Sequence, residues 1–218
     1  MRMDPKQLRI YAVTDKSWLK PGETLEQIVE ELLKAGVTCV QLRDKTADDG
    51  LLLSEAKTLN ALCRQYEVPL IINDRPDIAK KAGAAGVHVG LSDMGIAEAR
   101  KILGPEFIIG GSAHSPEEAL AAEKAGADYL GCGAVFGSHT KADAGYLPKE
   151  RLTAICEAIH IPAVAIGGIT VENIRELAGT GIAGTALVSC LFGAADKNAA
   201  VKQVDEALRD IMMPGSKA

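Results

Sequence analysis

The sequence predicts a single-domain α/β protein with the fold of a (β/α)8 barrel, the TIM barrel, and two observations lead to that prediction. Eight short apolar segments recur along the 218 residues, and segments with helical period separate them. Most of the apolar segments show little alternation of polar and apolar residues, as expected of parallel strands covered on both faces. Eight alternating units in a chain of this length are typical of a barrel. The alternative is a doubly wound open sheet, but no Gly-x-Gly-x-x-Gly motif follows the first apolar segment.

The predicted strands and helices follow one another in a regular order. Strands are expected at residues 8–13, 37–42, 70–72, 86–89, 107–110, 129–132, 163–166 and 184–188. Apolar stripes at helical spacing occupy residues 25–33 and 52–62, and Ser115, Pro116 and Glu118 predict a helix that starts with a capping box. Ala-Gly pairs that end at positions 36, 83 and 126 suit left-handed helix C-termini. We expect one domain over residues 1–218, with flexible ends at residues 1–7 and 213–218.

Composition and charge exclude several classes of protein. The net charge of −5 and the pI near 5.5 argue against nucleic acid or an anionic membrane as the main partner. No apolar run is long enough for a membrane span, and residues 1–7 lack the apolar segment of a signal peptide. The five cysteines contain no Cys-x-x-Cys pair, which favours small buried residues in a reducing compartment. We therefore expect a cytoplasmic protein with small-molecule partners; the oligomeric state, a homo-oligomer included, stays open.

The end of the second predicted strand concentrates positive charge. In an extended segment Gln41, Arg43 and Lys45 lie on one side, toward the barrel mouth if Gln41 faces inward. Two cations and an amide that point the same way suggest a ligand with dense negative charge. The alternative is a strand-end salt bridge with Asp44 or with a neighbouring helix.

Two aspartates follow neighbouring strands. Asp74 follows the third strand and Asp93 the fourth, and Mg²⁺ bound with substrate phosphates takes one or two such carboxylates. We therefore expect Asp74 and Asp93 to be metal ligands, with Mg²⁺ as the cofactor. The alternative is that each aspartate is the N-cap of the following helix.

Glycines and hydroxyl groups follow the later strands. Gly167 and Gly168 end the seventh strand, and Ser189 follows the eighth, where barrels commonly bind a phosphate through main-chain N–H groups. The loop at residues 133–145 carries Ser138, Thr140 and Lys141, a composition that suits an anion site. The alternatives are plain turn glycines and a solvated loop.

Three histidines lie near these strand ends. His88 is within an apolar strand, where we expect a backbone group to satisfy it. His114 and His139 stay open as acid–base groups.

Together these segments resemble the thiamine phosphate synthase family. The resemblance covers nearly the whole chain in order, and the combination of motifs is specific although each motif is short. It rests on residues 41–45 (QLRDK), 73–79 (NDRPDIA), 86–90 (GVHVG), Asp93, Ser112, Thr140-Lys141 and 165–169 (AIGGI).

The resemblance implies a transferase of thiamine biosynthesis, a thiamine-phosphate diphosphorylase. Such an enzyme joins 4-amino-2-methyl-5-hydroxymethylpyrimidine diphosphate to a thiazole phosphate, or to its carboxylated form, and releases pyrophosphate by a dissociative, Mg²⁺-assisted mechanism. By this likeness Asp74 and Asp93 hold Mg²⁺. Contacts with the pyrimidine diphosphate are implied for Gln41, Arg43, Lys45, Asn73, Ser112 and Lys141, and contacts with the thiazole phosphate for Ser138, Thr140, Gly168, Val188 and Ser189. Arg43, Lys45, Ser112 and Lys141 are the residues expected to be catalytic.

Two positions depart from the family pattern. Leu91 stands where the family usually has Gln, and Gly137-Ser138 stands where it often has Pro-Thr. Ser138 keeps a hydroxyl, whereas Leu91 removes a polar group near the expected metal. The alternative functions are a thiazole tautomerase of the same fold, which has no reason to keep paired metal aspartates, and a non-catalytic phosphate-binding barrel, in which charged strand ends would be fewer.

Overall fold

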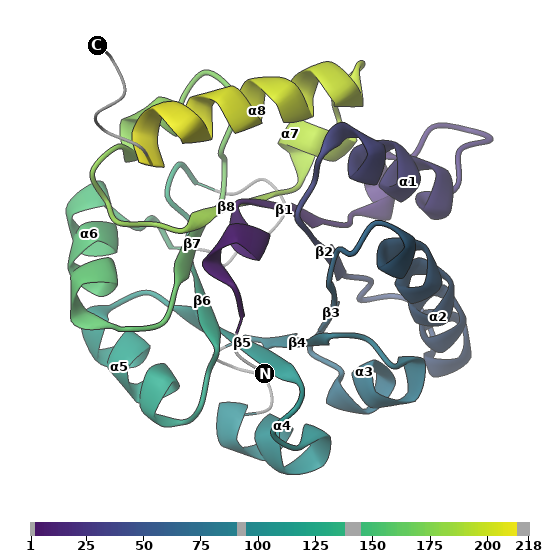
Figure 1. Cartoon of the computed structure of the whole chain (residues 1–218), viewed down its shortest axis with the longest axis horizontal. Helices are drawn as coiled ribbons and strands as arrows, with labels where there is room; N and C mark the ends of the chain where they lie inside the picture. The colour runs from purple at the N-terminus through teal and green to yellow at the C-terminus, as the bar shows by residue number, and fades with distance from the viewer. Residues whose placement is uncertain (1–2, 91–94, 138–144, 213–218) are drawn as a thin grey trace.

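The structure is a computed structural model that describes residues 3–90, 95–137 and 145–212, and in it eight parallel strands close into a barrel (Figure 1). Each strand pairs with the next along the chain, and the last pairs with the first. The strands are β1 (Ile10–Val13), β2 (Cys39–Leu42), β3 (Leu70–Asn73), β4 (Gly86–Val89), β5 (Ile108–Ala113), β6 (Tyr129–Gly133), β7 (Ala163–Ile166) and β8 (Gly184–Leu187). The predicted fold class is confirmed, and β5 continues three residues beyond its predicted end.

Helices surround the barrel. They are α1 (Leu25–Ala35), α2 (Asp49–Gln65), α3 (Pro76–Ala82), α4 (Ile96–Leu103), α5 (Pro116–Lys124), α6 (Lys149–Ala158), α7 (Ser189–Phe192) and α8 (Lys197–Met212). Three 3-10 helices are η1 (Pro5–Leu8), η2 (Lys16–Trp18) and η3 (Ile174–Leu177). Between β7 and β8 the described chain has η3 where the other crossovers have an α-helix.

Two of the predicted helix C-termini are present, and one predicted N-terminal motif is not. Gly36 and Gly83 end α1 and α3 in the left-handed conformation, as predicted. At α5 the Ser115 hydroxyl accepts from the Glu118 N–H, but the predicted capping box is wrong, because the Glu118 carboxylate accepts from the His114 N–H at 2.7 Å. A complete capping box is present instead at Thr24, the N-cap of α1.

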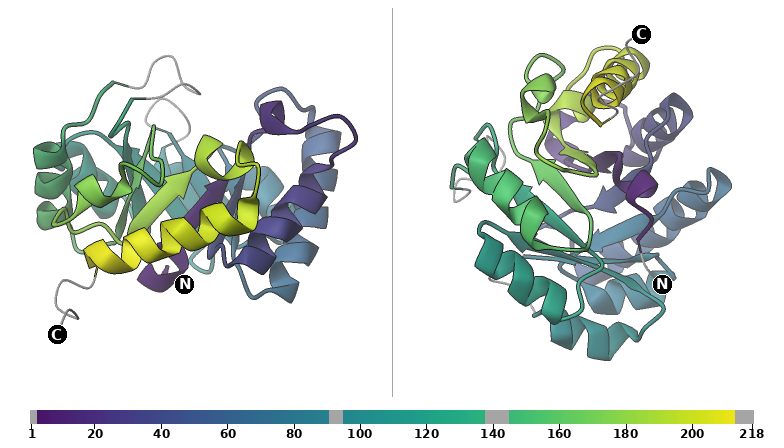
Figure 2. Two further views of the ribbon diagram at one scale, coloured as in Figure 1. Left: turned by 90° about the horizontal axis from the view of Figure 1, so that it is seen from above. Right: turned by 60° about the vertical axis from the view of Figure 1, so that its left-hand side comes forward.

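Two apolar layers hold the barrel. The larger layer lies between strands and helices, and the smaller fills the barrel interior. The interior layer comprises Met3, Leu8, Tyr11, Val13, Cys39, Ile71, Ile108, Tyr129, Val164 and Ala186. η1 lies across the N-terminal end of the barrel (Figures 1 and 2), and Met3 packs in the interior layer, within the segment that we expected to be a flexible end.

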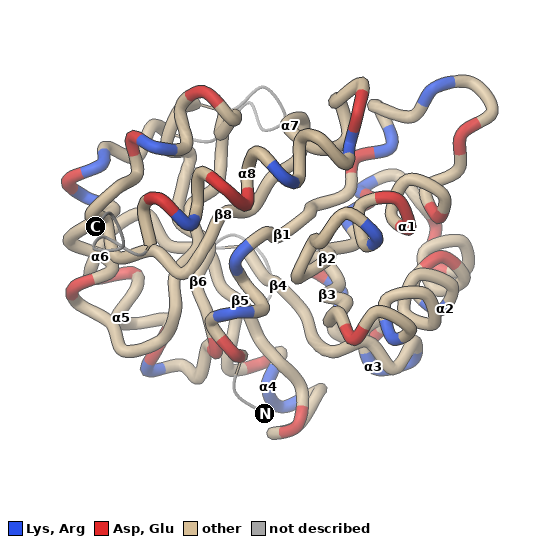
Figure 3. The backbone as a smooth tube through the Cα atoms, turned by 45° about the horizontal axis from the view of Figure 1, so that its top comes forward, with Lys and Arg blue, Asp and Glu red and all other residues tan. Residues whose placement is uncertain are grey.

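Surface and cysteine chemistry agree with the composition. Charges of both signs are interspersed along the outer helices (Figure 3). All five cysteines are free thiols, and Cys39, Cys63 and Cys132 are buried as predicted. Within the described ranges we find no helix with the length and apolar character that a membrane crossing requires.

Candidate active site at the carboxyl ends of the strands

Gln41 faces the barrel interior, which is the condition under which Arg43 and Lys45 were expected to point toward the mouth. Its side chain is almost fully buried, and its Nε2 donates to the Tyr11 hydroxyl at 2.7 Å. Two residues further on, Arg43 directly follows Leu42, the last residue of β2, which pairs with Ile72 of β3. The Thr14 hydroxyl holds the Arg43 main chain, since it accepts from the Arg43 N–H at 2.9 Å. The Thr14 hydroxyl therefore fixes the strand end that carries Gln41 and Arg43, while Leu42 between them packs in the outer apolar layer.

Asp44 does not neutralise the two cations beside it. Its carboxylate pairs with Lys16 of η2 at 2.7 Å and accepts two hydrogen bonds from Thr46 and one from the Ala47 N–H. Burial alone would raise the pKa of the Asp44 carboxyl, but Lys16 and these hydrogen bonds outweigh it and hold that pKa well below its usual range. The strand-end salt bridge considered for Arg43 and Lys45 is thus made by Lys16.

Arg43 and Lys45 differ in their surroundings. Lys45 is exposed, whereas Arg43 is half-buried and its Nε is a buried donor with no hydrogen-bond partner among the described residues. Neither side chain forms an ion pair with any other described residue. Arg9 Nε, before the start of β1, is a second such donor among the described residues, but only Arg43 Nε lies at the carboxyl ends of the strands, which makes it the candidate ligand-binding donor.

Asp74 bridges the ends of β3 and β4. One carboxylate oxygen accepts from Asn73 Nδ2 at 2.6 Å, and the other accepts from the Gly90 N–H at 3.3 Å. The Asp74 main chain has a positive φ of 59°, a conformation uncommon outside glycine that often marks functional sites. The alternative role of Asp74 as a helix N-cap is not observed, because Arg75 occupies that position of α3.

Ser112 and His88 meet inside the mouth. His88 Nε2 lies 3.2 Å from the Ser112 hydroxyl, and His88 Nδ1 lies 3.1 Å from the Tyr129 hydroxyl. The contacts of the His88 ring with other described residues are thus with two side-chain hydroxyls, where we expected a backbone group. His114, on the loop after β5, faces Glu118 with 3.5 Å between Nδ1 and Oε2.

The loops after β7 and β8 lie at the same end of the barrel. Gly167 and Gly168 have positive φ values of 101° and 64°, and a Cβ at Gly168 would come 2.5 Å from the Phe136 carbonyl oxygen. Gly168 is therefore required by the close approach of the segment after β6. Val188 is the N-cap of the short helix α7, whose first residue, Ser189, is exposed. Gly168, Val188 and Ser189 come from the two loops in which the sequence predicted a phosphate site.

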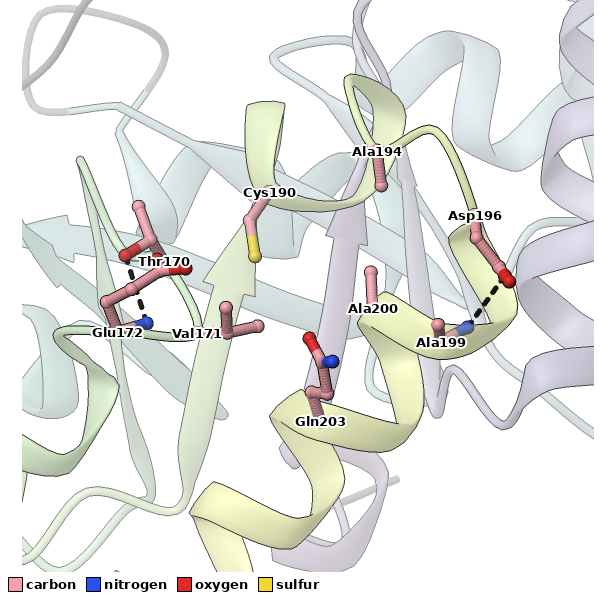
Figure 4. A pocket seen from close by; sticks show the side chains of 9 residues that line it. All are labelled: Thr170, Val171, Glu172, Cys190, Ala194, Asp196, Ala199, Ala200 and Gln203. Carbon is pink, nitrogen blue, oxygen red and sulfur yellow. Dashed lines mark hydrogen bonds between the residues drawn. The ribbon is translucent and has the colours of Figure 1, made fainter.

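A hollow of about 280 Å³ lies next to these loops, outside the barrel wall. Figure 4 shows its lining from the segment after β7, from α7 with its following residues, and from α8. The Cys190 thiol points into it, but burial raises the pKa of this thiol to about 11, so it is not a nucleophile near neutral pH. Gly168, Val188 and Ser189 do not line this hollow.

Several predicted site residues lie outside the described residues. They are Leu91, Asp93, Ser138, His139, Thr140 and Lys141. Within the described residues, no group of three or more His, Cys, Asp or Glu side chains forms a ready metal cage. Asp74 is thus the described half of the expected metal pair.

Four residues of the site were missed from the sequence. Tyr11 and Tyr129 contact Gln41 and His88, while Thr14 and Lys16 fix the loop that carries Arg43. The sequence did carry one signal for the tyrosines. Each is a polar aromatic residue inside an otherwise apolar strand, and a buried tyrosine hydroxyl usually has a partner.

Known proteins similar to this chain agree on one family. A family model described as thiamine monophosphate synthase matches residues 10–191. The thiamine-phosphate synthase of Ruminiclostridium cellulolyticum is 45% identical over 204 residues, which cover 94% of this chain and 95% of that protein. The thiamine-phosphate synthase 2 of Streptococcus pneumoniae is 42% identical over 210 residues, 96% of this chain and 100% of that protein. Among solved structures, the thiamine phosphate pyrophosphorylase of Pyrococcus furiosus has a TM-score of 0.88 at 38% identity, with coverage of 96% of this chain and 99% of that one.

Proposed function

The chain belongs to the thiamine monophosphate synthase family, a family of transferases, and we propose that it forms thiamine phosphate from two substrates. The first is 4-amino-2-methyl-5-hydroxymethylpyrimidine diphosphate, and the second is a thiazole phosphate or its carboxylated form. Pyrophosphate is the second product, and the carboxylated thiazole would release CO2 as well. The proposal takes the substrates from the family and the roles of individual residues from the barrel mouth.

The buried Nε of Arg43 carries the assignment of the diphosphate site. A buried donor of this kind needs an acceptor, and phosphate oxygens match the guanidinium fork. Because Asp44 already forms an ion pair with Lys16, both Arg43 and Lys45 are available to bind an anion at the end of β2. Gln41, Asn73 and Ser112 line the same mouth from β2, β3 and β5, and Lys141 would add a further cation.

The donor chemistry beside this site suits Mg²⁺. The described residues offer carboxylate oxygens of Asp74, held by N–H groups on both sides, and Mg²⁺ prefers one or two carboxylates together with substrate phosphates. Asp74 and Asp93 would hold the ion. When bound, Mg²⁺ neutralises charge on the diphosphate.

The thiazole phosphate is assigned to the loops after β6, β7 and β8. Gly168 brings the main chain of two loops together, and Val188 and Ser189 begin the short helix α7. Main-chain N–H groups and hydroxyls at such barrel loops are suited to a phosphate. Ser138 and Thr140 would supply further hydroxyl groups.

The reaction needs charge stabilisation more than it needs a base. The bond between the pyrimidinylmethyl carbon and the diphosphate oxygen breaks, and the electron pair leaves with pyrophosphate. Arg43, Lys45 and Lys141 stabilise the negative charge that grows there, while Ser112 helps to hold the pyrimidine. The thiazole nitrogen then donates its lone pair to the pyrimidinylmethyl cation, and the phosphate anchor keeps the two rings facing each other.

A reconstitution experiment tests this function. The purified chain is mixed with both substrates and Mg²⁺, and thiamine phosphate and pyrophosphate are measured together. We expect equal amounts of the two products, and no thiamine phosphate in EDTA. Thiazole isomerisation without pyrophosphate release would instead indicate a tautomerase, and the absence of any turnover would indicate a binding protein.

An Arg43 variant tests the observation that carries the assignment. Arg43→Gln should lower kcat/KM by about 10²–10³ because a preorganised donor to the leaving group is lost. Arg64→Gln, an exposed position near the end of α2, is the matched control and should be unchanged. An Arg43→Gln variant with wild-type kinetics would remove Arg43 from the mechanism.

A further inference from the structure

Five polar side chains form a continuous hydrogen-bonded chain across the barrel interior. Gln41 Nε2 donates to the Tyr11 hydroxyl, and the Tyr11 and Tyr129 hydroxyl oxygens are 2.8 Å apart. From Tyr129 the chain continues through both nitrogens of His88 to the Ser112 hydroxyl. The two ends, Gln41 and Ser112, are both residues assigned to the pyrimidine substrate. The chain therefore joins two substrate-binding side chains through Tyr11, Tyr129 and His88, which belong to neither proposed phosphate site.

The barrel is built around the rings of this chain. A Cβ at Gly110 would overlap the Tyr129 ring, and a Cβ at Gly131 would lie 3.1 Å from His88 Cε1. Tyr11 and Tyr129 pack edge to face with 6.0 Å between ring centroids, and the His88 and Tyr129 rings lie 5.5 Å apart. The two glycines on β5 and β6 thus make room for rings from β6 and β4.

The hydrogen bonds of the chain have one direction, because each tyrosine has a single proton to donate. The Tyr11 oxygen accepts from Gln41, so its proton goes to the Tyr129 oxygen. Tyr129 then donates to His88 Nδ1, which leaves the histidine proton on Nε2 for the Ser112 oxygen. Burial raises the pKa of both phenols, so they keep their protons at neutral pH. The Cys39 thiol beside Tyr11 is only a weak partner by comparison.

This direction fixes what the two ends can offer to a ligand. With Nε2 of Gln41 used inside the barrel, its Oε1 is left as an acceptor, and Ser112, having accepted from His88, is left with a proton to donate. Turning the Gln41 amide over would reverse every bond and would exchange acceptor and donor at both ends. The polarity of the chain, meaning whether Gln41 offers an acceptor and Ser112 a donor or the reverse, is therefore set for both ends together.

We propose that Tyr11, Tyr129 and His88 are positioning residues that set this coupled polarity, so that the mouth reads an aminopyrimidine and rejects the corresponding oxopyrimidine. The inference rests on the proposed function for its substrate. An aminopyrimidine presents an NH2 donor beside a ring-nitrogen acceptor, which matches an acceptor at Gln41 and a donor at Ser112. The oxo form presents the reverse pair. A site built on such hydrogen bonds discriminates strongly, because the wrong ligand leaves its groups unpaired.

The tautomer of His88 tests the polarity without any substrate. Long-range ¹H–¹⁵N correlation spectra of histidine-labelled protein distinguish protonated from unprotonated ring nitrogens. Of the four histidines, His88 is assigned in a variant in which the other three are replaced by Gln. We expect the proton that faces Ser112 to be on Nε2, with Nδ1 unprotonated, in the wild-type chain. A proton on Nδ1 would mean the reverse polarity and would overturn the proposal.

Tyrosine variants test the positioning role. In Tyr129→Phe the His88 Nδ1 loses its donor, so we expect a mixture of both tautomers. In Tyr11→Phe the Gln41 amide loses its fixed partner and can present either end. The ratio of kcat/KM for the 4-amino substrate to that for its 4-oxo analogue should therefore fall at least tenfold, through the KM of the pyrimidine, while the KM of the thiazole phosphate changes less than twofold. Tyr66→Phe, which removes an outer hydroxyl 3.3 Å from Glu30, is the matched control.

The outcomes separate this inference from the function on which it rests. Wild-type discrimination in folded Tyr11→Phe, or a single unchanged tautomer in Tyr129→Phe, would overturn the positioning role. If either variant fails to fold by circular dichroism, the wild-type tautomer still decides the polarity. A wild-type chain with its His88 proton on Nε2 but without turnover would refute the proposed function and leave the polarity supported.

Discussion

Replacing Asp44 by Asn should reveal how strongly the Lys16–Asp44 pair stabilises the loop that carries Arg43. The Asp44 side chain is only 7% exposed, and its carboxylate accepts from Lys16, Thr46 and Ala47. A hydrogen bond to a charged group contributes about 1.5–3 kcal/mol, and Asn can keep the main-chain bonds while losing the charge. We therefore expect Asp44→Asn to lower the free energy of unfolding by about 2 kcal/mol at pH 7.

The dependence of this difference on pH follows from the lowered pKa of Asp44. The folded-state pKa lies below the unfolded value of about 3.9, so as the pH falls the unfolded chain takes up the proton first. The stabilisation is complete above the unfolded pKa and is lost as the pH falls toward the folded one. At pH 3.5 the difference between wild type and Asp44→Asn should be about 0.7 kcal/mol smaller than at pH 7.

Urea denaturation followed by circular dichroism at several pH values between 3.5 and 7 measures both quantities. Glu31→Gln, an exposed carboxylate on α1, is the control and should change stability by less than about 0.5 kcal/mol at each pH. The reasoning would be refuted by a difference for Asp44→Asn that stays constant with pH. It would also be refuted by one that grows as the pH falls, since a lowered pKa permits only the opposite sign.

Three further variants address the remaining parts of the proposed mechanism. Lys141→Ala should lower kcat about 10²–10³-fold and change KM much less, which single-turnover kinetics measures; a rate within twofold of wild type would exclude Lys141. Gly168→Asp should raise the KM of the thiazole phosphate. Because any side chain here would approach the Phe136 carbonyl oxygen closely, the substitution should also lower Tm. Gly168→Ala is therefore the control for the effect of packing alone. Equal KM values in these two folded variants would argue against a phosphate at this loop. Asp74→Asn should require more Mg²⁺ for half-maximal rate, and an unchanged Mg²⁺ requirement would contradict its assignment as a ligand.

The fold could be predicted because its signals are local. Buried parallel strands leave apolar segments, and helices between them leave a 3.6-residue period, so each unit is visible in its own stretch of sequence. Alternation likewise predicted that Gln41, Arg43 and Lys45 share one side of an extended segment, but it did not show which side faces the interior. The capping box at Ser115 failed because Glu118 had a second main-chain donor within reach, and a motif does not show which donor wins.

Contacts across the barrel could not be predicted in the same way. Tyr11 and Tyr129 are 118 positions apart, and their hydroxyls meet only because barrel closure brings β1 and β6 to opposite sides of one interior. Lys16 and Asp44 likewise come from different loops. Such pairings depend on strand register and ring packing, which the order of residues along a single strand does not contain.

The N-terminal segment has a consequence for where this chain can be cut. The family model begins at residue 10 and ends at residue 191, yet Met3 and Leu8 belong to the apolar interior, and Val201, Val204 and Leu208 of α8 belong to the layer outside the strands. Arg9 further ties the start of β1 to α8 through Asp205 at 2.8 Å. A truncation to residues 10–191 would retain all eight strands. It would remove Met3 and η1 from the N-terminal end of the barrel, and α8 from the outer layer. The segment that defines the family is therefore smaller than the unit that must fold.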